Sequence, residues 1–274
     1  MRKRMSVVLA VVISSFAIAQ TKSPRSAAAD NAPASETCAF TFSSGSGHGV
    51  TQYCVTANGN IAQFSVVAGN TLPSEFLKGV APAIEGYGLC DTSTRPFTAY
   101  WDYASGDSGN WNAATSISTP TSVKIARTTA DGVWKIVQTI AETKGSKFTY
   151  GSATIAMALT NLSTSDRIII LNRYANIDAG ESTFNDFDRS EISVWGGVPD
   201  GNGPALSLTA AFVNTPFDFS ISFVNTVPDA PIPCQSHTTF TSGFFEGDGG
   251  VDQDFNLEIA PGKTKTVVVA YRPM

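Results

Sequence analysis

Aromatic and polar side chains gather between residues 100 and 111 of this chain. Aromatic rings stack on the apolar faces of ligands such as sugars, and neighbouring acids and amides hydrogen-bond to hydroxyl groups. The Gly and Ser residues between them favour an exposed loop. The segment therefore predicts ligand contact, and packing of the rings in a protein core is the alternative. The candidate contact residues are Tyr100, Trp101, Asp102, Tyr103, Asn110 and Trp111. Trp195, before two glycines, could join such a surface or pack in the core.

Five carboxylates crowd the stretch from residue 178 to residue 191, and three interpretations stay open. The first is a solvated loop with Arg189 in a local ion pair. The second is a Ca²⁺ site, because short polar spacers let several carboxylate oxygens meet at one ion. Its candidate ligands are Asp178, Glu181, Asp186 and Asp188. The third is an acid and a base for cleaving a glycosidic bond, which needs two carboxyl groups about 5–10 Å apart. The candidates for that pair are Asp186, Asp188, Glu191 and, from earlier in the chain, Glu85.

A further acidic segment begins at Asp252 like the Ca²⁺ loop of an EF-hand. That loop needs a glycine at its sixth position and a carboxylate at its twelfth, where this chain has Leu257 and Lys263. Alternation explains the acids better, because residues two apart in a strand point to the same side. We therefore expect one solvated strand face that carries Asp252, Asp254, Asn256 and Glu258.

The four cysteines are Cys38, Cys54, Cys90 and Cys234. An even number in an exported chain favours two disulfides, for which three connectivities exist. The pair Cys38–Cys54 would bracket a Gly- and Ser-rich turn, and Cys90–Cys234 would join a middle loop to a late one. We favour this pairing over a zinc site, because the sequence has no CxxC or HxxxH spacing.

The first nineteen residues have the pattern of a secretory signal peptide. Arg2, Lys3 and Arg4 precede an apolar run, which ends in the small-residue cleavage pattern of residues 17–19. The run is shorter than the roughly 20 residues that span a bilayer, and no later segment reaches that length. We therefore expect cleavage after Ala19 and a mature protein without a membrane span, secreted or periplasmic.

The net charge of the chain argues against two classes of partner. Cleavage leaves fifteen Lys and Arg residues against twenty-three Asp and Glu residues, a net charge of about −8. An acidic chain without a basic patch repels the phosphate backbone of nucleic acids and the surface of anionic membranes. We expect neither as a partner.

Strand patterns fill the chain from residue 37 onward. Residues 20–36 are rich in Ala, Ser and Pro and predict a disordered linker. After them, short alternating runs lie between Gly, Pro, Asn and Asp clusters, which is typical of an all-β sandwich or barrel. We expect a single antiparallel β-sandwich domain over residues 37–274, with its longest strands at residues 148–161 and 167–177.

A long strand, an Asn turn and a long return strand occupy residues 153–178, and a late strand–Pro–Gly–strand hairpin includes residues 256–263. In this arrangement the chain resembles galactose-mutarotase-like domains, which implies their large β-sandwich, a supersandwich. The chain also looks like many uncharacterised exported bacterial β-proteins. The mutarotases use histidines and a glutamate around the sugar, whereas this chain has only His48 and His237, outside any matching motif. The resemblance therefore implies a fold and no catalytic residue.

These features predict a secreted, disulfide-bonded β-sandwich that binds carbohydrate or a cell-surface polymer without catalysis. One alternative is a carbohydrate-active enzyme with an Asp/Glu pair, and another is a surface-assembly protein with no small ligand. No cofactor is expected beyond a structural Ca²⁺. The sequence indicates neither the ligand nor the oligomeric state.

Overall fold

The computed structural model describes residues 38–44, 49–67, 74–77, 85–181, 184–199, 204–211, 218–227, 231–235, 240–241 and 243–274. The expected signal peptide (residues 1–19) and linker (residues 20–36) lie outside these ranges. The described part consists of β-strands, their connections and one short 3₁₀ helix, η1 (Ala179–Glu181). Within it, no helix is long and apolar enough to cross a membrane.

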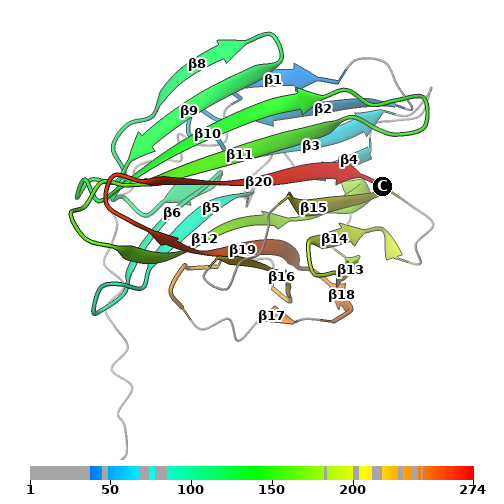
Figure 1. Cartoon of the computed structure of the whole chain (residues 1–274). Helices are drawn as coiled ribbons and strands as arrows, with labels where there is room; N and C mark the ends of the chain where they lie inside the picture. Colours follow the sequence, from blue (N-terminus) through cyan, green and yellow to red (C-terminus); the bar gives the residue numbers. More distant parts are fainter. Residues whose placement is uncertain are drawn as a thin grey trace, which may run out of the picture. The chain divides into compact units, whose positions relative to one another are not determined.

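The strands form three antiparallel sheets (Figure 1). Sheet I has nine strands, in the order β18 (Phe245–Gly247), β13 (Asn185–Arg189), β14 (Ser193–Gly197), β15 (Ala205–Ala211), β20 (Thr264–Pro273), β11 (Ser152–Asn161), β10 (Trp134–Thr143), β9 (Ser122–Thr128) and β8 (Thr115–Thr119). Sheet II has seven, in the order β17 (Phe240–Thr241), β16 (Phe219–Asn225), β19 (Gly250–Ile259), β12 (Arg167–Asn176), β5 (Glu85–Asp91), β6 (Thr98–Tyr103) and β7 (Gly106–Asp107). Sheet III has four, in the order β1 (Phe40–Ser43), β2 (Val50–Val55), β3 (Ile61–Val67) and β4 (Ser74–Leu77).

Sheets I and II pack face to face, and alternation along each strand decides which side chains lie between them. In β10, Trp134, Ile136, Gln138 and Ile140 are buried, whereas the alternate residues Lys135, Val137 and Thr139 are exposed or half-buried. In β12, Ile169 and Leu171 are buried in the same core. Each such side chain stabilises the fold by about 1.5–3 kcal/mol. The predicted all-β antiparallel sandwich is confirmed.

The last strand joins segments that lie far apart in the sequence. β20 pairs with β11 on one side and with β15 on the other, so it closes the middle of sheet I. Figure 1 shows it in red between green and yellow-green strands. Its inward side chains Val267, Val269 and Tyr271 are fully buried. The long strands β11 and β12 occupy the residues for which the sequence predicts them.

Sheet III packs against the inner side of sheet I. The ring of Phe64 lies 6.1 Å from that of Tyr271, centroid to centroid. The Thr51 hydroxyl donates to the Gly151 carbonyl across 3.0 Å. A disulfide joins Cys38 to Cys54 in β2, as the sequence predicts.

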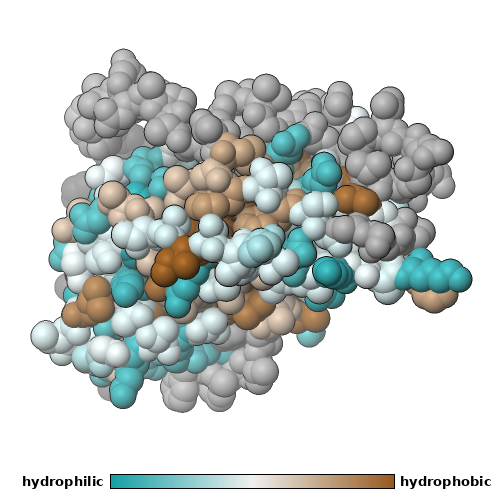
Figure 2. Space-filling view, turned by 90° about the horizontal axis from the view of Figure 1, so that it is seen from above, coloured by the Kyte–Doolittle hydropathy of each residue, from teal (hydrophilic) through white to brown (hydrophobic). Residues whose placement is uncertain are grey.

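At the far edge of sheet I, β8 is exposed along its whole length, and Ile117 is 76% exposed. β8 pairs with β9 on one side only. In the view from above, apolar side chains (brown) gather towards the middle of the face, among polar ones (teal and white) (Figure 2). An exposed strand edge of this kind is what a surface-assembly protein would need.

Candidate functional site

The outer face of sheet II carries an ordered grid of side chains. Antiparallel pairing places directly opposed residues on the same face of a sheet. One row across five strands is formed by Ile221, Asp254, Asn172, Gly88 and Trp101. The carboxyl group of Asp254 in β19 therefore has the amide of Asn172 as its neighbour on β12.

The next row holds Phe223, Asp252, Tyr174, Gly86 and Tyr103. The paired glycines of β5 leave the sheet surface hollow between β12 and β6. Their neighbours on either side are large, since the rings of Tyr103 and Tyr174 meet edge to face at 6.3 Å. Aromatic rings from β6 and β12 thus stand on either side of the β5 glycines.

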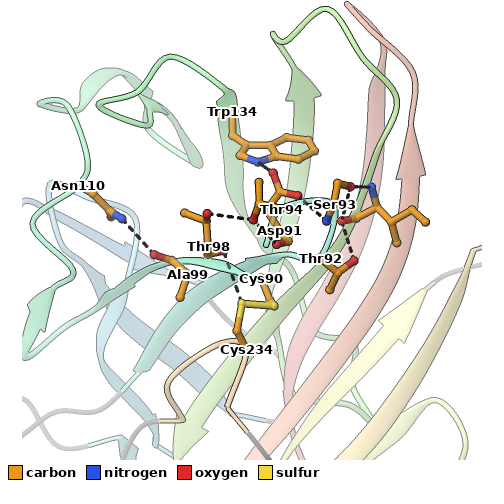
Figure 3. The surroundings of a disulfide bond; sticks show 11 residues. Cys90, Asp91, Thr92, Ser93, Thr94, Thr98, Ala99, Asn110, Trp134 and Cys234 are labelled. Carbon is orange, nitrogen blue, oxygen red and sulfur yellow. Dashed lines mark hydrogen bonds between the residues drawn. A yellow bond between two sulfur atoms is a disulfide. The ribbon is translucent and has the colours of Figure 1, made fainter. Parts of the chain in front are cut away.

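Residues 231–235, which we call the strap, cross this hollow. The Tyr103 hydroxyl donates to the Pro231 carbonyl at 2.7 Å, and the disulfide Cys90–Cys234 fixes the other end to β5 (Figure 3). A Cβ at Gly88 would lie only 2.4 Å from Cγ of Pro233 and would collide with it. Glycine is therefore required at position 88 for the strap to lie against the sheet.

Cys234 adopts a left-handed backbone conformation with φ of 71°, which residues other than glycine seldom adopt. The covalent bond to β5 and a turn bond from Gln235 N to the Ile232 carbonyl (3.2 Å) hold it there. The sequence prediction of a Cys90–Cys234 disulfide is confirmed, and its consequence is a covalently fastened cover on the outer face of sheet II.

A pocket of about 190 Å³ lies beside the strap. The disulfide forms one wall, and Ile170 and the ring of Phe97 contribute apolar surface. Its polar lining comes from Thr92, Asn172, Gln235 and Asp254. The Phe97 side chain is 43% exposed.

The loop that carries Phe97 is held by Asp91, at the end of β5. Its Oδ2 accepts from Trp134 Nε1 at 3.2 Å and from Arg167 at 2.9 Å. Thr94 donates to the Asp91 carbonyl at 3.2 Å, as Figure 3 shows. The Arg95 guanidinium lies 4.1 Å from the centroid of the Phe97 ring. The ring is therefore presented by an ordered loop.

The carboxyl groups of Asp252 and Asp254 share the outer face and are both buried, at 0% and 8% exposure. Burial raises the pKa of Asp254 to about 7. Burial, and then the neighbouring Asp254 charge, raise the pKa of Asp252 well above its ordinary range. The pair therefore holds at least one proton at neutral pH. The expectation of a solvated strand face is wrong at these positions, because neighbouring strands and the strap cover them.

Asn172 links the carboxyl pair to the pocket. Its amide nitrogen donates to both oxygens of Asp252, at 3.3 Å each. Its carbonyl oxygen Oδ1 is buried and has no hydrogen-bond partner among the described residues. A buried acceptor left unpaired is costly, by about 1–3 kcal/mol. A ligand hydroxyl that reached Oδ1 would relieve that cost.

The aromatic segment predicted for ligand contact is divided between the two faces of sheet II. Tyr100 and Trp111 point inward and pack edge to face at 6.1 Å. The Tyr100 hydroxyl donates to Asp131 at 2.5 Å. Asp102 is fully buried, and it pairs with Arg127 and accepts from Asn60. Tyr100 and Trp111 therefore pack in the core, which is the alternative to ligand contact that the sequence left open.

Three other residues of that segment lie differently. Trp101 and Tyr103 are on the outer face, with their rings stacked at 5.7 Å. Trp101 is partly exposed, on the far side of β5 from Asn172. The Asn110 amide nitrogen donates to the Ala99 carbonyl at 3.0 Å (Figure 3). The Ser108 hydroxyl donates to the Asn110 side-chain oxygen. Trp101 is therefore the predicted contact residue that shares a solvent-facing surface with the pocket.

Glu85 lies between the sheets, away from both surfaces. Its carboxylate is 1% exposed and forms an ion pair with Arg173 at 2.5 Å. It also accepts from the Tyr271 hydroxyl at 2.8 Å. Burial raises the pKa of Glu85, and the Arg173 charge opposes that rise. Arg173 in turn donates to Gln138 of sheet I at 2.7 Å. Glu85 thus ties the two sheets together.

The other predicted carboxylates lie on or beside sheet I. Asp186 and Asp188 are half-buried in β13, where Asp188 is paired across the sheet with Trp195. Asp178 precedes η1, and Glu181 ends it. Glu191 is exposed between β13 and β14. Within the described residues, no three His, Cys, Asp or Glu side chains form a group able to hold a metal ion. The structure does not bring these acids together with Glu85 or with residues 100–111, which belong to sheet II.

Sequence reasoning missed the carboxyl pair of Asp252 and Asp254 and the role of Asn172. The alternation of acids in β19 was visible, but burial of their face was not. The pairing of Cys234 with Cys90 was the available signal, because it places a late loop over β5 and hence near β19.

No protein-family model matches this sequence, and neither does any curated protein. Solved structures are similar in fold. The GalM/aldose epimerase homologue from C. elegans gives a TM-score of 0.49 at 9% identity, over 86% of this chain and 98% of that one. A bacterial glucoamylase complexed with acarbose gives 0.48 at 11% identity, over 87% of this chain and 32% of that one. A polysaccharide lyase gives 0.47 at 11% identity, over 78% of this chain and 30% of that one.

The similarity to the epimerase homologue is one of fold only. This chain spans about a third of the length of the glucoamylase and of the lyase. Similarity at this level concerns the arrangement of strands and carries no argument about binding or activity. Any function has to be argued from the residues of the site itself.

Proposed function

We propose that this protein binds a sugar unit of a glycan or cell-surface polymer in the pocket beside the strap. The observation that carries the proposal is the pocket's lining, in which an exposed Phe97 ring faces the same space as Asn172, Asp254 and Gln235. A pyranose ring has apolar faces and a rim of hydroxyl groups, and this lining offers a partner for each.

The polar partners are complementary in hydrogen bonding. Asn172 Oδ1 is a buried acceptor without a partner among the described residues, so it suits a hydroxyl donor. With a pKa of about 7, Asp254 can donate when protonated and accept when ionised. Sugar hydroxyls act in both ways, which favours an uncharged sugar at this position.

Trp101 extends the surface beyond the strap. It is partly exposed on the same outer face, in the same row as Asn172. We propose that a second sugar unit of a longer chain rests on this ring. The two disulfides are compatible with an extracellular or periplasmic protein, where such polymers are met.

The test is binding of neutral oligosaccharides, first on a glycan array and then by titration of the tightest ligand. Phe97→Ala should weaken binding about tenfold, because an aromatic contact contributes about 0.5–1.5 kcal/mol beyond its burial. Trp101→Ala should weaken binding of long oligosaccharides more than of short ones. Ile117→Ala on β8 removes an exposed apolar side chain that does not line the pocket and is the control.

Two results would contradict the proposal. One is the absence of binding to any neutral glycan, which would leave a surface-assembly role. The other is equal affinity of the Phe97→Ala variant and the unchanged protein. Because Phe97 is partly exposed, its replacement should leave the fold intact, which circular dichroism checks.

A second candidate function is acid–base chemistry on the bound sugar. The observation that favours it is the buried carboxyl pair, in which burial raises the pKa of Asp254 to about 7 and that of Asp252 well above its ordinary range. Such a pair supplies an acid and a base within one site. We assign this role to Asp252 and Asp254 in preference to Glu85, which the ion pair with Arg173 occupies.

Turnover of a panel of glycosides and free aldoses would test this second function. Asp254→Asn should abolish turnover but keep sugar binding, whereas Asp186→Asn on sheet I should leave both unchanged. Turnover that survives in Asp254→Asn would exclude the pair as the acid and base.

A further inference from the structure

A second pocket, of about 500 Å³, opens at the end of sheet I where the hairpin of β10 and β11 meets the last residues of β20. Its lining includes the cations Lys144 and Arg272, the exposed ring of Phe148, and the hydroxyl-bearing Thr143 and Ser152. No Asp or Glu side chain is among the described residues that line it. The chain as a whole carries more acids than bases, so this local excess of positive charge is unusual.

Among the residues that the structure describes, the two cations have no ion-pair partner. Within the described part of the chain, neither Lys144 nor Arg272 forms an ion pair, whereas Arg127, Arg167, Arg173 and Lys265 all do. Both side chains are exposed. An unpaired guanidinium can receive a carboxylate or sulfate through two parallel hydrogen bonds.

The register of sheet I brings the two cations to one place. Thr143 is paired with Ser152, and Ala153 is paired with Tyr271. Because β11 and β20 are antiparallel, Ser152 lies beside Arg272 on the next strand. Lys144 comes directly after Thr143. The hydroxyl groups of Thr143 and Ser152 thus lie between the two positive charges.

The aromatic part of the pocket is held in place although it faces solvent. Phe148 is 80% exposed, the most of any large apolar side chain that the structure describes. It sits in a turn that the Ser146 and Thr149 backbones close reciprocally, at 3.0 and 3.4 Å. Lys147 lies 5.7 Å from the ring centroid and adds a third cation. A solvent-facing ring on an ordered turn is a suitable surface for stacking.

We propose that this pocket is a second glycan site, which binds an acidic sugar unit. The carboxylate or sulfate of the sugar pairs with Arg272 and Lys144, its hydroxyls reach Thr143 and Ser152, and its ring rests against Phe148. The site is separate from the neutral-sugar pocket on sheet II and does not depend on it.

The same row of sheet I gives an acidic polymer a path beyond the pocket. Ser207 is paired with Arg272 on one side and with Trp195 on the other, so all three share the outer face. Two strand spacings, about 10 Å, separate Arg272 from the partly exposed Trp195 ring. An oligomer anchored at Arg272 can therefore place a later unit on Trp195, and longer oligomers should bind more tightly.

The experiment titrates the full protein with four probes: an oligouronate, a sulfated oligosaccharide, a neutral oligosaccharide of the same length, and inorganic sulfate. At least one of the two acidic oligomers should bind, and that binding should weaken at high salt. The double variant Lys144→Gln/Arg272→Gln should bind it about tenfold more weakly, because each charged hydrogen bond is worth more than a neutral one. Phe148→Ala should weaken it by a smaller factor.

The matched control is Lys124→Gln, which removes an exposed cation from β9 of the same sheet, outside the pocket. It should leave acidic binding unchanged, as should Phe97→Ala in the other pocket. Equal binding by the double variant, or equal binding of the neutral oligomer, would overturn the proposal. Inorganic sulfate that bound as tightly as the oligomers would also overturn it, since the sugar ring would then contribute nothing.

Discussion

The buried carboxyl of Asp254 makes the stability of this protein depend on pH in a direction opposite to that of most carboxylates. Replacing it by asparagine keeps the size and shape of the side chain and removes the titrating proton. The variant Asp254→Asn should therefore be more stable than the unchanged protein above neutral pH and close to it in acid.

The sign and size of this stability difference follow from the pKa of Asp254 in the folded and in the unfolded chain. Burial raises the pKa of Asp254 from 3.8 to about 7 in the folded chain, whereas the unfolded chain keeps an ordinary value near 4. Between these values the folded state holds the proton and the unfolded state has lost it, so the free energy of unfolding falls as pH rises. The resulting loss in the free energy of unfolding is about 4 kcal/mol, since a change of one in pKa corresponds to about 1.4 kcal/mol.

Urea unfolding of both proteins across a pH series, followed by tryptophan fluorescence, measures this difference. The free energy of unfolding of Asp254→Asn minus that of the unchanged protein should grow between about pH 4 and about pH 7 and then level off. Glu258→Gln is the control, because Glu258 lies on the same face of β19 but is exposed. A difference for Asp254→Asn that stays constant with pH would refute the burial argument.

The remaining predictions concern the interior and the strap. Arg173→Met leaves Glu85 buried without its ion-pair partner and should lower the free energy of unfolding by about 3–5 kcal/mol, measured in urea; an unchanged midpoint would contradict the interior role of the pair. Cys90→Ser/Cys234→Ser should lower it by about 2–4 kcal/mol and make the strap the first site of limited proteolysis; identical digestion patterns would argue against the strap. Gly88→Ala should displace the strap and weaken neutral-glycan binding while circular dichroism stays the same, and full affinity in this variant would show that the strap does not shape the pocket.

Much of the fold could be predicted from the sequence, because alternation and turn residues are local signals. The strand β11 follows from apolar residues two apart, and β12 follows from a continuous apolar run; the turn between the two strands contains Asn and Ser. The disulfide pairing was predicted from the expected export of the chain and from the spacing of the cysteines. Sheet order could not be predicted, since β20 lies between β11 and β15 through pairings that are distant in the sequence and that no local pattern encodes.

The site was harder to predict, because a strand pattern states which residues share a face but not what covers that face. Asp252 and Asp254 were expected on one side of a strand, and they are; their burial depends on the strap and on neighbouring strands. For the same reason Tyr100 and Trp101 could not be sorted into inner and outer faces. Arg173 escaped notice because an arginine in an apolar strand looks like a surface residue until its buried partner is known.

The two faces of sheet II are coupled by the strands themselves. In β12, Arg173 points inward to Glu85 while its neighbours Asn172 and Tyr174 point outward to the carboxyl pair. Glu85 is the first residue of β5 and anchors that strand through its ion pair with Arg173. The outer face of the same strand carries Gly88, over which the strap lies. The interior ion pair therefore sets the position of two strands on which the pocket depends, so a change at Arg173 should alter glycan binding although it touches no ligand. That coupling distinguishes a site built into the sheet from one carried by loops alone.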